Sequence, residues 1–298
     1  MSDTPASLSD VQSGDTEPAS EVRAPIALTI AGSDPSGGAG IQADLKTFTV
    51  HSVYGASVIT ALTAQNTLGV RGVHNVPAAS VAAQLEAVQA DLNVSALKTG
   101  MLATAEIVEV VADGMRADRW LGKRPKVVID PVMVATSGAL LLEPDAIAIM
   151  RGSLFSDADL VTPNLAEAAH LCSSDVATTL EAMVIQGQKI LAYGPKAVLV
   201  KGGHLSGRDG EAQAVDVLVM GDGVDEFRSV RVDSRHTHGS GCTLSAAICA
   251  NLAKGRDLVS AIRQAKAFVS AAIASAALRP VGHGRAPLDH FAKFDPGD

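Results

Sequence analysis

Short apolar runs of strand length alternate with helical patterns along most of this sequence. The runs at 26–31, 56–62, 126–129 and 197–200 each end in a polar or glycine-containing loop. Strands that alternate with helices favour a parallel sheet, because a parallel neighbour is reached through a crossover connection that is usually helical. We therefore predict an α/β fold with a mostly parallel central sheet and helices on both faces.

Four residues of chemical interest fall at the ends of predicted strands. They are Gly32, Gln65, Met101 and Asp130. Ligands of open parallel sheets bind beyond the carboxyl ends of the strands, so the sequence predicts a binding site at this edge. Later in the chain, an alternating pattern on both sides of residues 221–223 predicts an antiparallel hairpin.

The composition suits one domain with a core of aliphatic side chains. The chain has 298 residues, of which 47% are hydrophobic and 3% aromatic. Residues 1–24 are rich in Ser, Asp, Glu, Pro and Ala, so we predict a disordered tail there. With no composition break further on, we predict a single domain over residues 25–298.

Charge and cysteine content narrow the expected partners and compartment. The formal net charge of −8 argues against nucleic acid and anionic membranes as partners. Three widely spaced cysteines argue against a disulfide framework. Neither a secretory signal nor a membrane-length apolar run is visible. We therefore expect a cytoplasmic protein, which could bind phosphates through glycine loops, a few lysines and a divalent ion.

The segment 236–247, HTHGSGCTLSAA, carries the clearest local chemistry. Gly239, Ser240 and Gly241 lead directly into an alanine-rich helical run. A helix that begins after glycines presents unpaired N–H groups and its positive dipole end, and together these bind anions. Cys242 falls in the first turn, where the same groups favour a thiolate, so we expect its pKa to be lowered.

Three other interpretations of this segment are available. It could be a glycine turn that caps a buried helix, with Cys242 as a small core residue. A zinc site at His236, His238 and Cys242 would need a fourth ligand, and Cys249 lies roughly 10 Å further along a helix. A Cys–His nucleophile would lack any acyl-transfer motif around it.

The loop after the first predicted strand, residues 32–40, does not fit two common nucleotide motifs. Gly38 stands where a P-loop requires lysine. Residues 38–43 fit a dinucleotide fingerprint poorly, because they begin well past the strand end. In addition, no acidic residue between Asp44 and Glu86 could bind a ribose.

Two further positions have both a structural and a functional interpretation. Asn164 and Glu167 are three residues apart, a spacing that fits a capping box and also a hydrated magnesium site. Lys201 follows an apolar strand, where it could balance phosphate charge or simply face solvent.

Several of these segments resemble one enzyme family. Residues 31–46, AGSDPSGGAGIQADLK, residues 201–204, KGGH, and residues 237–247, THGSGCTLSAA, are similar to motifs of the hydroxymethylpyrimidine/phosphomethylpyrimidine kinases of the ribokinase-like superfamily. The resemblance spans about residues 26–291. It implies a ribokinase-like fold and ATP-dependent phosphorylation of 4-amino-5-hydroxymethyl-2-methylpyrimidine, then of its monophosphate, for thiamine synthesis. It also implies Mg²⁺, and we expect a homodimer.

The same resemblance implies roles for individual residues. Cys242 would be the catalytic base, where most of the superfamily has aspartate, and Gly239, Ser240 and Gly241 would form the anion hole. The substrate would be bound by Gly32, Asp44, Gln65, Met101 and Val132. The ATP phosphates would be bound by Asn164, Lys201 and Thr237, and the metal by Glu167 and Asn164 through water.

The chain departs from the family pattern at Thr136, where many relatives have lysine, and at Ala139, which is often polar. Two rival functions follow from the same motifs. One is a pyridoxal or pyridoxine kinase, which Gln65 disfavours because its amide matches an aminopyrimidine edge. The other is a non-catalytic pyrimidine-binding module in which Cys242 is a decayed aspartate. The intact glycines and the Asn-x-x-Glu pair argue against that decay.

Overall fold

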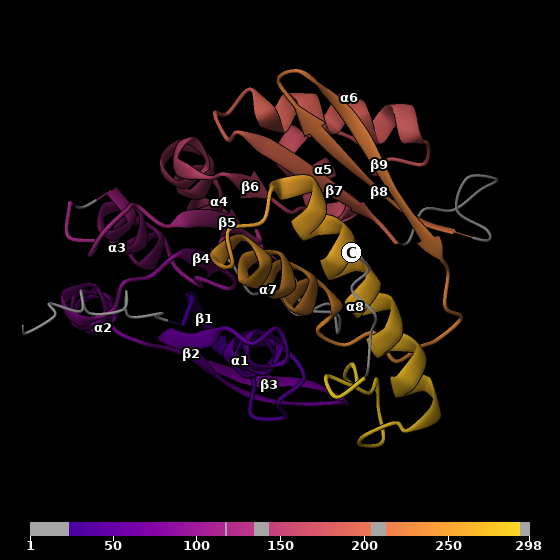
Figure 1. Cartoon of the computed structure of the whole chain (residues 1–298), viewed down its shortest axis with the longest axis horizontal. Coiled ribbons are helices and arrows are strands. Elements are labelled where there is room, and N and C mark those ends of the chain that lie inside the picture. The colour runs from indigo at the N-terminus through magenta and orange to yellow at the C-terminus, as the bar shows by residue number, and fades with distance from the viewer. Residues whose placement is uncertain (1–23, 117, 134–142, 204–212, 293–298) are drawn as a thin grey trace, which may run out of the picture.

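A computed structural model describes residues 24–116, 118–133, 143–203 and 213–292. In these ranges, nine strands form one sheet in the order β3-β2-β1-β4-β5-β6-β7-β8-β9 (Figure 1). The strands are β1 (Ile26–Ser33), β2 (Tyr54–Asn66), β3 (Gly69–Asn75), β4 (Ala96–Thr99), β5 (Lys126–Ile129), β6 (Leu160–Val161), β7 (Ala197–Gly202), β8 (Gln213–Met220) and β9 (Gly223–Val230). The predicted tail and the loop with Thr136 and Ala139 lie outside the described residues.

Eight α-helices accompany the sheet in the described part of the chain. They are α1 (Gly40–Val50), α2 (Ala78–Asp91), α3 (Ala105–Arg116), α4 (Pro144–Ile149), α5 (Leu165–Cys172), α6 (Leu180–Leu191), α7 (Ser240–Ala253) and α8 (Leu258–Leu278). A π-helical turn (Met150–Leu154) and a 3₁₀ turn (Phe155–Asp157) follow α4. None of these helices is long and apolar enough to cross a membrane.

The sheet is mixed, which refines the prediction of a mostly parallel one. Six neighbouring strands of the sheet, β2, β1, β4, β5, β6 and β7, are parallel. The pairs β2–β3, β7–β8 and β8–β9 are antiparallel, so both edges depart from the parallel arrangement. The connections β2–β3 and β8–β9 contain two residues each, too few for the crossover that parallel strands need. The predicted hairpin is confirmed as β8 and β9.

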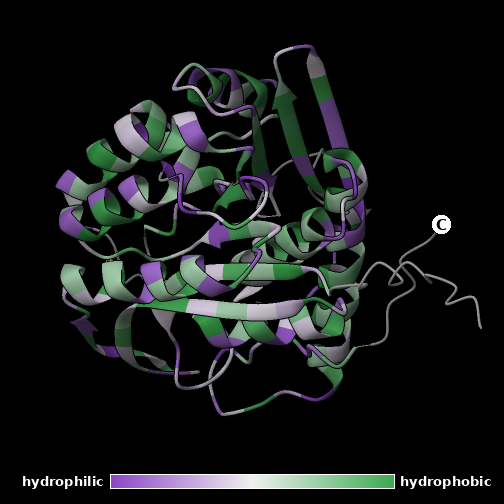
Figure 2. Ribbon diagram, turned by 60° about the vertical axis from the view of Figure 1, so that its left-hand side comes forward, coloured by the Kyte–Doolittle hydropathy of each residue, from purple (hydrophilic) through white to green (hydrophobic). Residues whose placement is uncertain are grey.

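Alternate residues of the central strands pack on opposite faces of the sheet. Leu28, Leu97 and Val198 join one core cluster, whereas their neighbours Ala27 and Ala96 join another. The first cluster includes side chains from α2, α3, α4, α5 and α6, and the second includes side chains from α1, α7 and α8. Figure 2 shows the hydrophobic stretches along the strands between these helices. The prediction of helices on both faces is confirmed.

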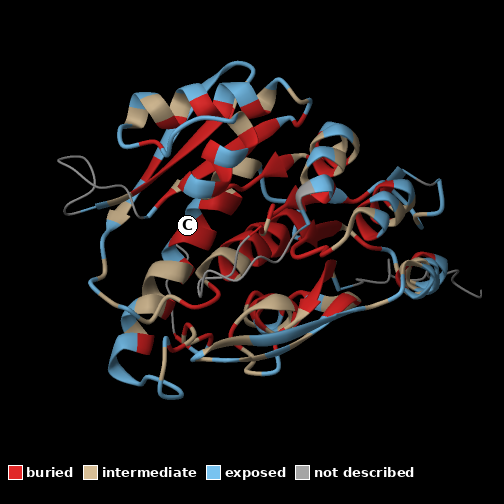
Figure 3. Cartoon of the chain, turned by 180° about the vertical axis from the view of Figure 1, so that it is seen from behind, coloured by how far each residue is buried: buried red, intermediate tan, exposed pale blue. Residues whose placement is uncertain are grey.

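Helix α7 is the most enclosed helix of the described chain. Every residue from Thr243 to Ala253 is buried, and the helix packs against α1, α8, β1, β4 and β5. Figure 3 shows the buried residues along the strands and the inner helix faces. Small side chains such as Ala246, Ala247 and Ala250 allow these close contacts. The packing fixes the N-terminus of α7 at the carboxyl ends of the strands.

Candidate active site

A cavity of about 620 Å³ lies at the carboxyl ends of the parallel strands, the edge that the sequence predicts. It receives side chains from the ends of β1, β2, β4, β5 and β7 and from the starts of α5 and α7. The predicted site residues that line it are Gly32, Gln65, Met101, Val132, Asn164, Glu167, Lys201, Thr237, Gly239, Ser240, Gly241 and Cys242. The structure therefore brings together residues from across most of the chain.

The glycine loop before α7 has the backbone that the sequence predicts. Gly239 is the N-cap residue with φ of 80°, a conformation that glycine adopts without strain. A Cβ atom at Gly239 would lie 1.8 Å from the carbonyl oxygen of Gly38, so the loops of α1 and α7 meet backbone to backbone. The N–H groups of Gly241 and Cys242 belong to the first turn, where a helix offers no carbonyl acceptor. They are therefore suited to bind an anion.

A buried ion pair lies beside this loop. Lys201 Nζ donates to Asp130 Oδ1 at 2.8 Å, and Asp130 also accepts from the hydroxyls of Thr162 and Ser245, both at 3.2 Å. Burial opposes both charges, but each partner outweighs it: the pKa of Asp130 is lowered and that of Lys201 is raised. A Cβ atom on Gly241 would be 3.3 Å from Lys201 Nζ. A fixed positive charge thus lies next to the anion-binding loop.

The Asn164–Glu167 pair forms the capping box of α5. Glu167 N donates to Asn164 Oδ1 at 2.9 Å, and Asn164 N donates to Glu167 Oε2 at 2.8 Å. Both residues also line the cavity. Burial raises the pKa of Glu167 to about 7; the charge of Lys201 counters this, and that of Asp130 adds to it. The structural interpretation is therefore confirmed, while the cavity position also leaves room for a metal role.

Asp44 is not among the residues that line the cavity, and its predicted role in substrate binding stays a prediction. Its carboxylate is fully buried in α1 and accepts from Lys98 Nζ at 3.1 and 3.0 Å and from Thr29 Oγ1 at 2.6 Å. Its acceptor positions are thus directed into the protein. Lys98, which the sequence places inside a short strand, reaches the cavity wall instead.

The expectation of a lowered pKa for Cys242 is wrong. Burial raises the pKa of this thiol to about 11; the charge of Lys98 opposes the rise, and those of Asp44 and Asp130 add to it. The helix start is present, but the partly buried Cys242 side chain lies near the carboxylates of Asp44 and Asp130 as well as the ammonium groups of Lys98 and Lys201. At neutral pH the thiol is therefore protonated.

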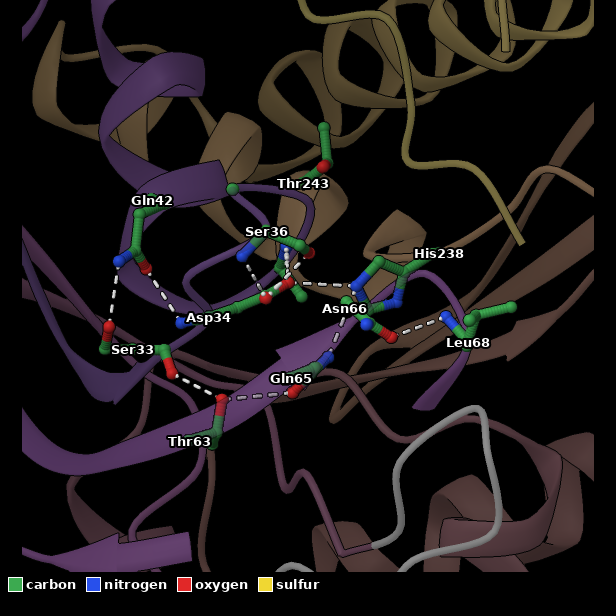
Figure 4. A network of polar contacts seen from close by, with 12 residues as sticks. Ser33, Asp34, Ser36, Gln42, Thr63, Gln65, Asn66, Leu68, His238 and Thr243 are labelled. Carbon is green, nitrogen blue, oxygen red and sulfur yellow. Dashed lines mark hydrogen bonds and ion pairs between the residues drawn. The ribbon is translucent and has the colours of Figure 1, made fainter. Parts of the chain in front are cut away.

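Sequence reasoning missed a polar contact between two loops of the site. His238 Nε2 lies 2.9 Å from Asp34 Oδ2 and 3.3 Å from Gln65 Nε2 (Figure 4). His236 Nδ1 instead accepts from Ala286 N at 3.1 Å. Among the described residues no group of His, Cys, Asp and Glu could hold a metal ion by itself, so nothing supports zinc here. The sequence feature that could have indicated the Asp34–His238 contact is the position of Asp34 between two glycines, Gly32 and Gly37.

The sequence and structure match known kinases. The phosphomethylpyrimidine kinase family model matches residues 34–289. A hydroxymethylpyrimidine/phosphomethylpyrimidine kinase of Rhizobium meliloti (strain 1021) is 51% identical over 269 residues, which cover 90% of this chain and 98% of the relative. An ADP complex of Bacillus subtilis pyridoxal kinase has a TM-score of 0.80 at 38% identity and covers 91% of this chain and 98% of its own. A phosphomethylpyrimidine kinase from Clostridium difficile 630 has a TM-score of 0.70 at 39% identity, covering 82% and 97%. The chain belongs to the phosphomethylpyrimidine kinase family.

Proposed function

We propose that the protein transfers the γ-phosphoryl group of ATP to 4-amino-5-hydroxymethyl-2-methylpyrimidine and then to its monophosphate, in thiamine biosynthesis. The observation that carries this proposal is that two features line one cavity. One is the side-chain amide of Gln65, which can match an aminopyrimidine edge, and the other is an anion-binding helix start next to Lys201. A substrate that is flat and polar at one end and accepts phosphate at the other matches this arrangement.

Phosphoryl transfer asks the protein mainly for positioning and charge stabilisation. A bond forms between the hydroxyl oxygen and the γ-phosphorus while the bond between that phosphorus and ADP breaks, and the hydroxyl proton is released to water. Gly239, Gly241 and Cys242 would supply backbone N–H groups to the charge that develops on the phosphoryl oxygens, while Ser240 N donates to Thr237 O at 3.1 Å and closes the turn. Lys201 adds a positive charge, and Asp130 keeps its ammonium group directed at the loop. Thr237 and Asn164 line the same cavity and would bind the ATP phosphates.

Cys242 is the candidate for the catalytic base in this site, but its thiol is protonated at neutral pH. We assign it the task of orienting the hydroxyl group that attacks the phosphorus. Its sulfur can accept the proton only as thiolate, and a raised pKa makes that thiolate scarce. Loss of the side chain should therefore misplace the nucleophile.

The residues around Glu167 fit Mg²⁺, which the family implies. Magnesium prefers oxygen donors and is usually bound by one or two carboxylates together with water and substrate phosphates. Asp130 raises the pKa of the buried Glu167, and a divalent cation would offset this repulsion between carboxylates. Glu167 and Asn164 would hold the ion through water. When bound, the ion would neutralise phosphate charge.

Pyridoxal is the second candidate substrate, because a pyridoxal kinase matches the whole fold closely. The side chains facing the ring should decide between the two. Gly32, Met101 and Val132 form apolar or backbone walls that would accept either ring. Gln65 offers a donor beside an acceptor, which an aminopyrimidine edge satisfies fully and a phenolic edge does not. We therefore place pyridoxal below the pyrimidine.

Product identification by mass spectrometry tests the proposal. Protein, Mg-ATP and one candidate alcohol are incubated together, and the expected products are the pyrimidine monophosphate followed by the diphosphate. Pyridoxal phosphate formed at equal or higher kcat/KM would overturn the substrate assignment. ADP release without any phosphorylated alcohol would overturn the kinase proposal itself.

We also propose that residues 25–298 act as one domain and that the protein is a homodimer. A single sheet that takes strands from β1 to β9 supports the first statement. The β2–β3 edge carries the exposed apolar side chains Leu62, Leu68 and Val73, which supports the second. Light scattering on the purified chain should give twice the monomer mass, and the monomer mass would contradict the dimer.

A further inference from the structure

The side-chain amide of Gln65 lies between two hydrogen-bonding partners. On one side Gln65 Nε2 lies 3.3 Å from His238 Nε2, and on the other Gln65 Oε1 lies 3.3 Å from Thr63 Oγ1 (Figure 4). The amino and carbonyl ends of a glutamine amide have nearly the same shape, and a half-turn about the terminal bond exchanges them. The neighbouring groups therefore decide which end faces which side.

Thr63 demands a donor from Gln65. Thr63 Oγ1 lies 2.8 Å from the carbonyl oxygen of Ser33. A carbonyl oxygen carries no hydrogen, so the single hydroxyl hydrogen of Thr63 must lie between these two oxygens. Toward Gln65 the hydroxyl offers only lone pairs. The amide end that suits this position is the NH₂ group.

His238 demands an acceptor from Gln65. Its Nε2 atom lies 2.9 Å from Asp34 Oδ2, a carboxylate that also accepts from the N–H groups of Ala39 and Ser36 and from the Ser36 hydroxyl. Burial disfavours the Asp34 charge, but the hydrogen bonds from His238 and Ser36 outweigh this and lower the pKa of Asp34. The proton between them is therefore on Nε2, which then has no lone pair for a second NH₂ group. A carbonyl oxygen can share that N–H.

We propose that Asp34 and His238 on one side, and Ser33 and Thr63 on the other, lock the Gln65 amide with its carbonyl toward His238 and its NH₂ group toward Thr63. Gln42 shows the same kind of selection nearby, since its Oε1 accepts from Asp34 N and its Nε2 donates to Ser33 Oγ. Asp34, Thr63 and His238 are thus positioning residues that fix the direction in which Gln65 reads a ligand.

This inference rests on the proposed function for its consequence. A locked amide accepts only from a donor on the His238 side and donates only to an acceptor on the Thr63 side. The aminopyrimidine ring must then lie with its exocyclic amine toward His238 and its adjacent ring nitrogen toward Thr63. The 4-oxo analogue, 5-hydroxymethyl-2-methylpyrimidin-4(3H)-one, has the donor and acceptor reversed at the same edge. A locked amide should reject it, whereas a free amide could turn to fit it.

The test compares kcat/KM for the amino and oxo alcohols in the full chain. We expect the wild type to prefer the amino compound by at least about 10²-fold. His238→Leu and the nearly isosteric Thr63→Val should each lower this ratio by about 10-fold, because the amide loses one of its two constraints. Thr60→Val is the matched control: it also removes a threonine hydroxyl from β2, one that donates to Met101 O at 2.6 Å. Its ratio should equal that of the wild type.

A general loss of structure would lower kcat/KM for both compounds and leave the ratio unchanged, so the ratio separates positioning from stability. An unchanged ratio in both His238→Leu and Thr63→Val would overturn the proposal. Neutron diffraction from crystals of the protein in D₂O gives a readout without substrate. We expect two deuterons on the Gln65 atom that faces Thr63, and two deuterons facing His238 would also overturn the lock. If the wild type phosphorylates neither alcohol, the proposed function fails, while the neutron map still decides the orientation.

Discussion

Replacing Lys98 by methionine would leave the Asp44 carboxylate buried without its cation. Both side chains are fully buried, and Lys98 Nζ contacts the two carboxylate oxygens at 3.1 and 3.0 Å. After the replacement, only the Thr29 hydroxyl among the described contacts would still donate to Asp44. Breaking a buried pair on one side typically costs about 3–5 kcal/mol of unfolding free energy. We expect Lys98→Met to fall in this range at pH 8.

The loss should depend on pH. Burial already raises the pKa of Asp44, with Lys98 and Thr29 opposing the rise, so removing Lys98 raises it further. Between the unfolded value, about 3.9, and the raised folded value, the folded state holds a proton that the unfolded state releases. The contribution of Asp44 to the stability of the variant is therefore fully present below the unfolded pKa and is lost as pH rises through the raised folded pKa. We expect a clearly smaller deficit against wild type at pH 5 than at pH 8.

Urea unfolding followed by circular dichroism at both pH values measures these differences. Lys98→Met/Asp44→Leu should recover most of the lost stability, because no unpaired charge remains. Lys196→Met is the control, since its partner Asp159 is paired at the surface and exposed pairs contribute about 0–1 kcal/mol. The reasoning is refuted if Lys98→Met stays within about 1 kcal/mol of wild type at pH 8, or if the double variant is less stable than the single one.

Three further changes test the rest of the molecule. Cys242→Ala should lower kcat by about 10²–10⁴-fold, while Cys242→Asp should retain measurable activity. Alkylation of Cys242 should accelerate with each pH unit up to 9, because the pKa of its thiol is about 11. Full activity of the alanine variant across pH 6–9 would mean that Cys242 contributes only to packing. Gln65→Leu should reduce kcat/KM for the pyrimidine by about 10–100-fold, and a calorimetric titration should show unchanged ATP binding. An equal loss of kcat/KM for pyridoxal would contradict a role of Gln65 in ring recognition. Deleting residues 2–23 should leave Tm and kcat nearly unchanged, whereas a fall of many degrees would mean that this segment packs on the domain.

Local sequence patterns were sufficient to place most of the fold and most of the cavity lining. The strand predicted over 126–129 has those bounds in the structure, and the strand predicted over 197–200 begins at the predicted residue. Gly239 was predictable because a positive φ and a backbone contact tolerate no other residue. These features depend on backbone conformation and on the periodicity of apolar side chains, both of which can be read from neighbouring residues.

Features that depend on contacts across the sheet were not predictable in the same way. Nothing near Asp44 in the sequence indicates that Lys98, 54 residues later, binds its carboxylate, so motif similarity alone could not reveal this buried ion pair. The Asp34–His238 contact joins loops 204 residues apart. The direction in which β3 pairs with β2 follows from the length of their turn, which is hard to read until both strands are bounded.

The prediction for Cys242 shows how a correct argument from the helix start can give the wrong direction for a pKa shift. A helix start favours a thiolate by its dipole, an effect of about 0.3–1 kcal/mol at exposed positions. Desolvation shifts the pKa of a fully buried group by up to about 3–5 units, and it is also the largest effect on the partly buried Cys242. The charge of Lys98 opposes this rise in pKa, but Asp44 binds the same ammonium group and its charge acts in the opposite direction. The burial that raises the pKa of Cys242 keeps its thiol protonated at neutral pH, and this is why we propose that it orients the attacking hydroxyl group and does not act as a resting base.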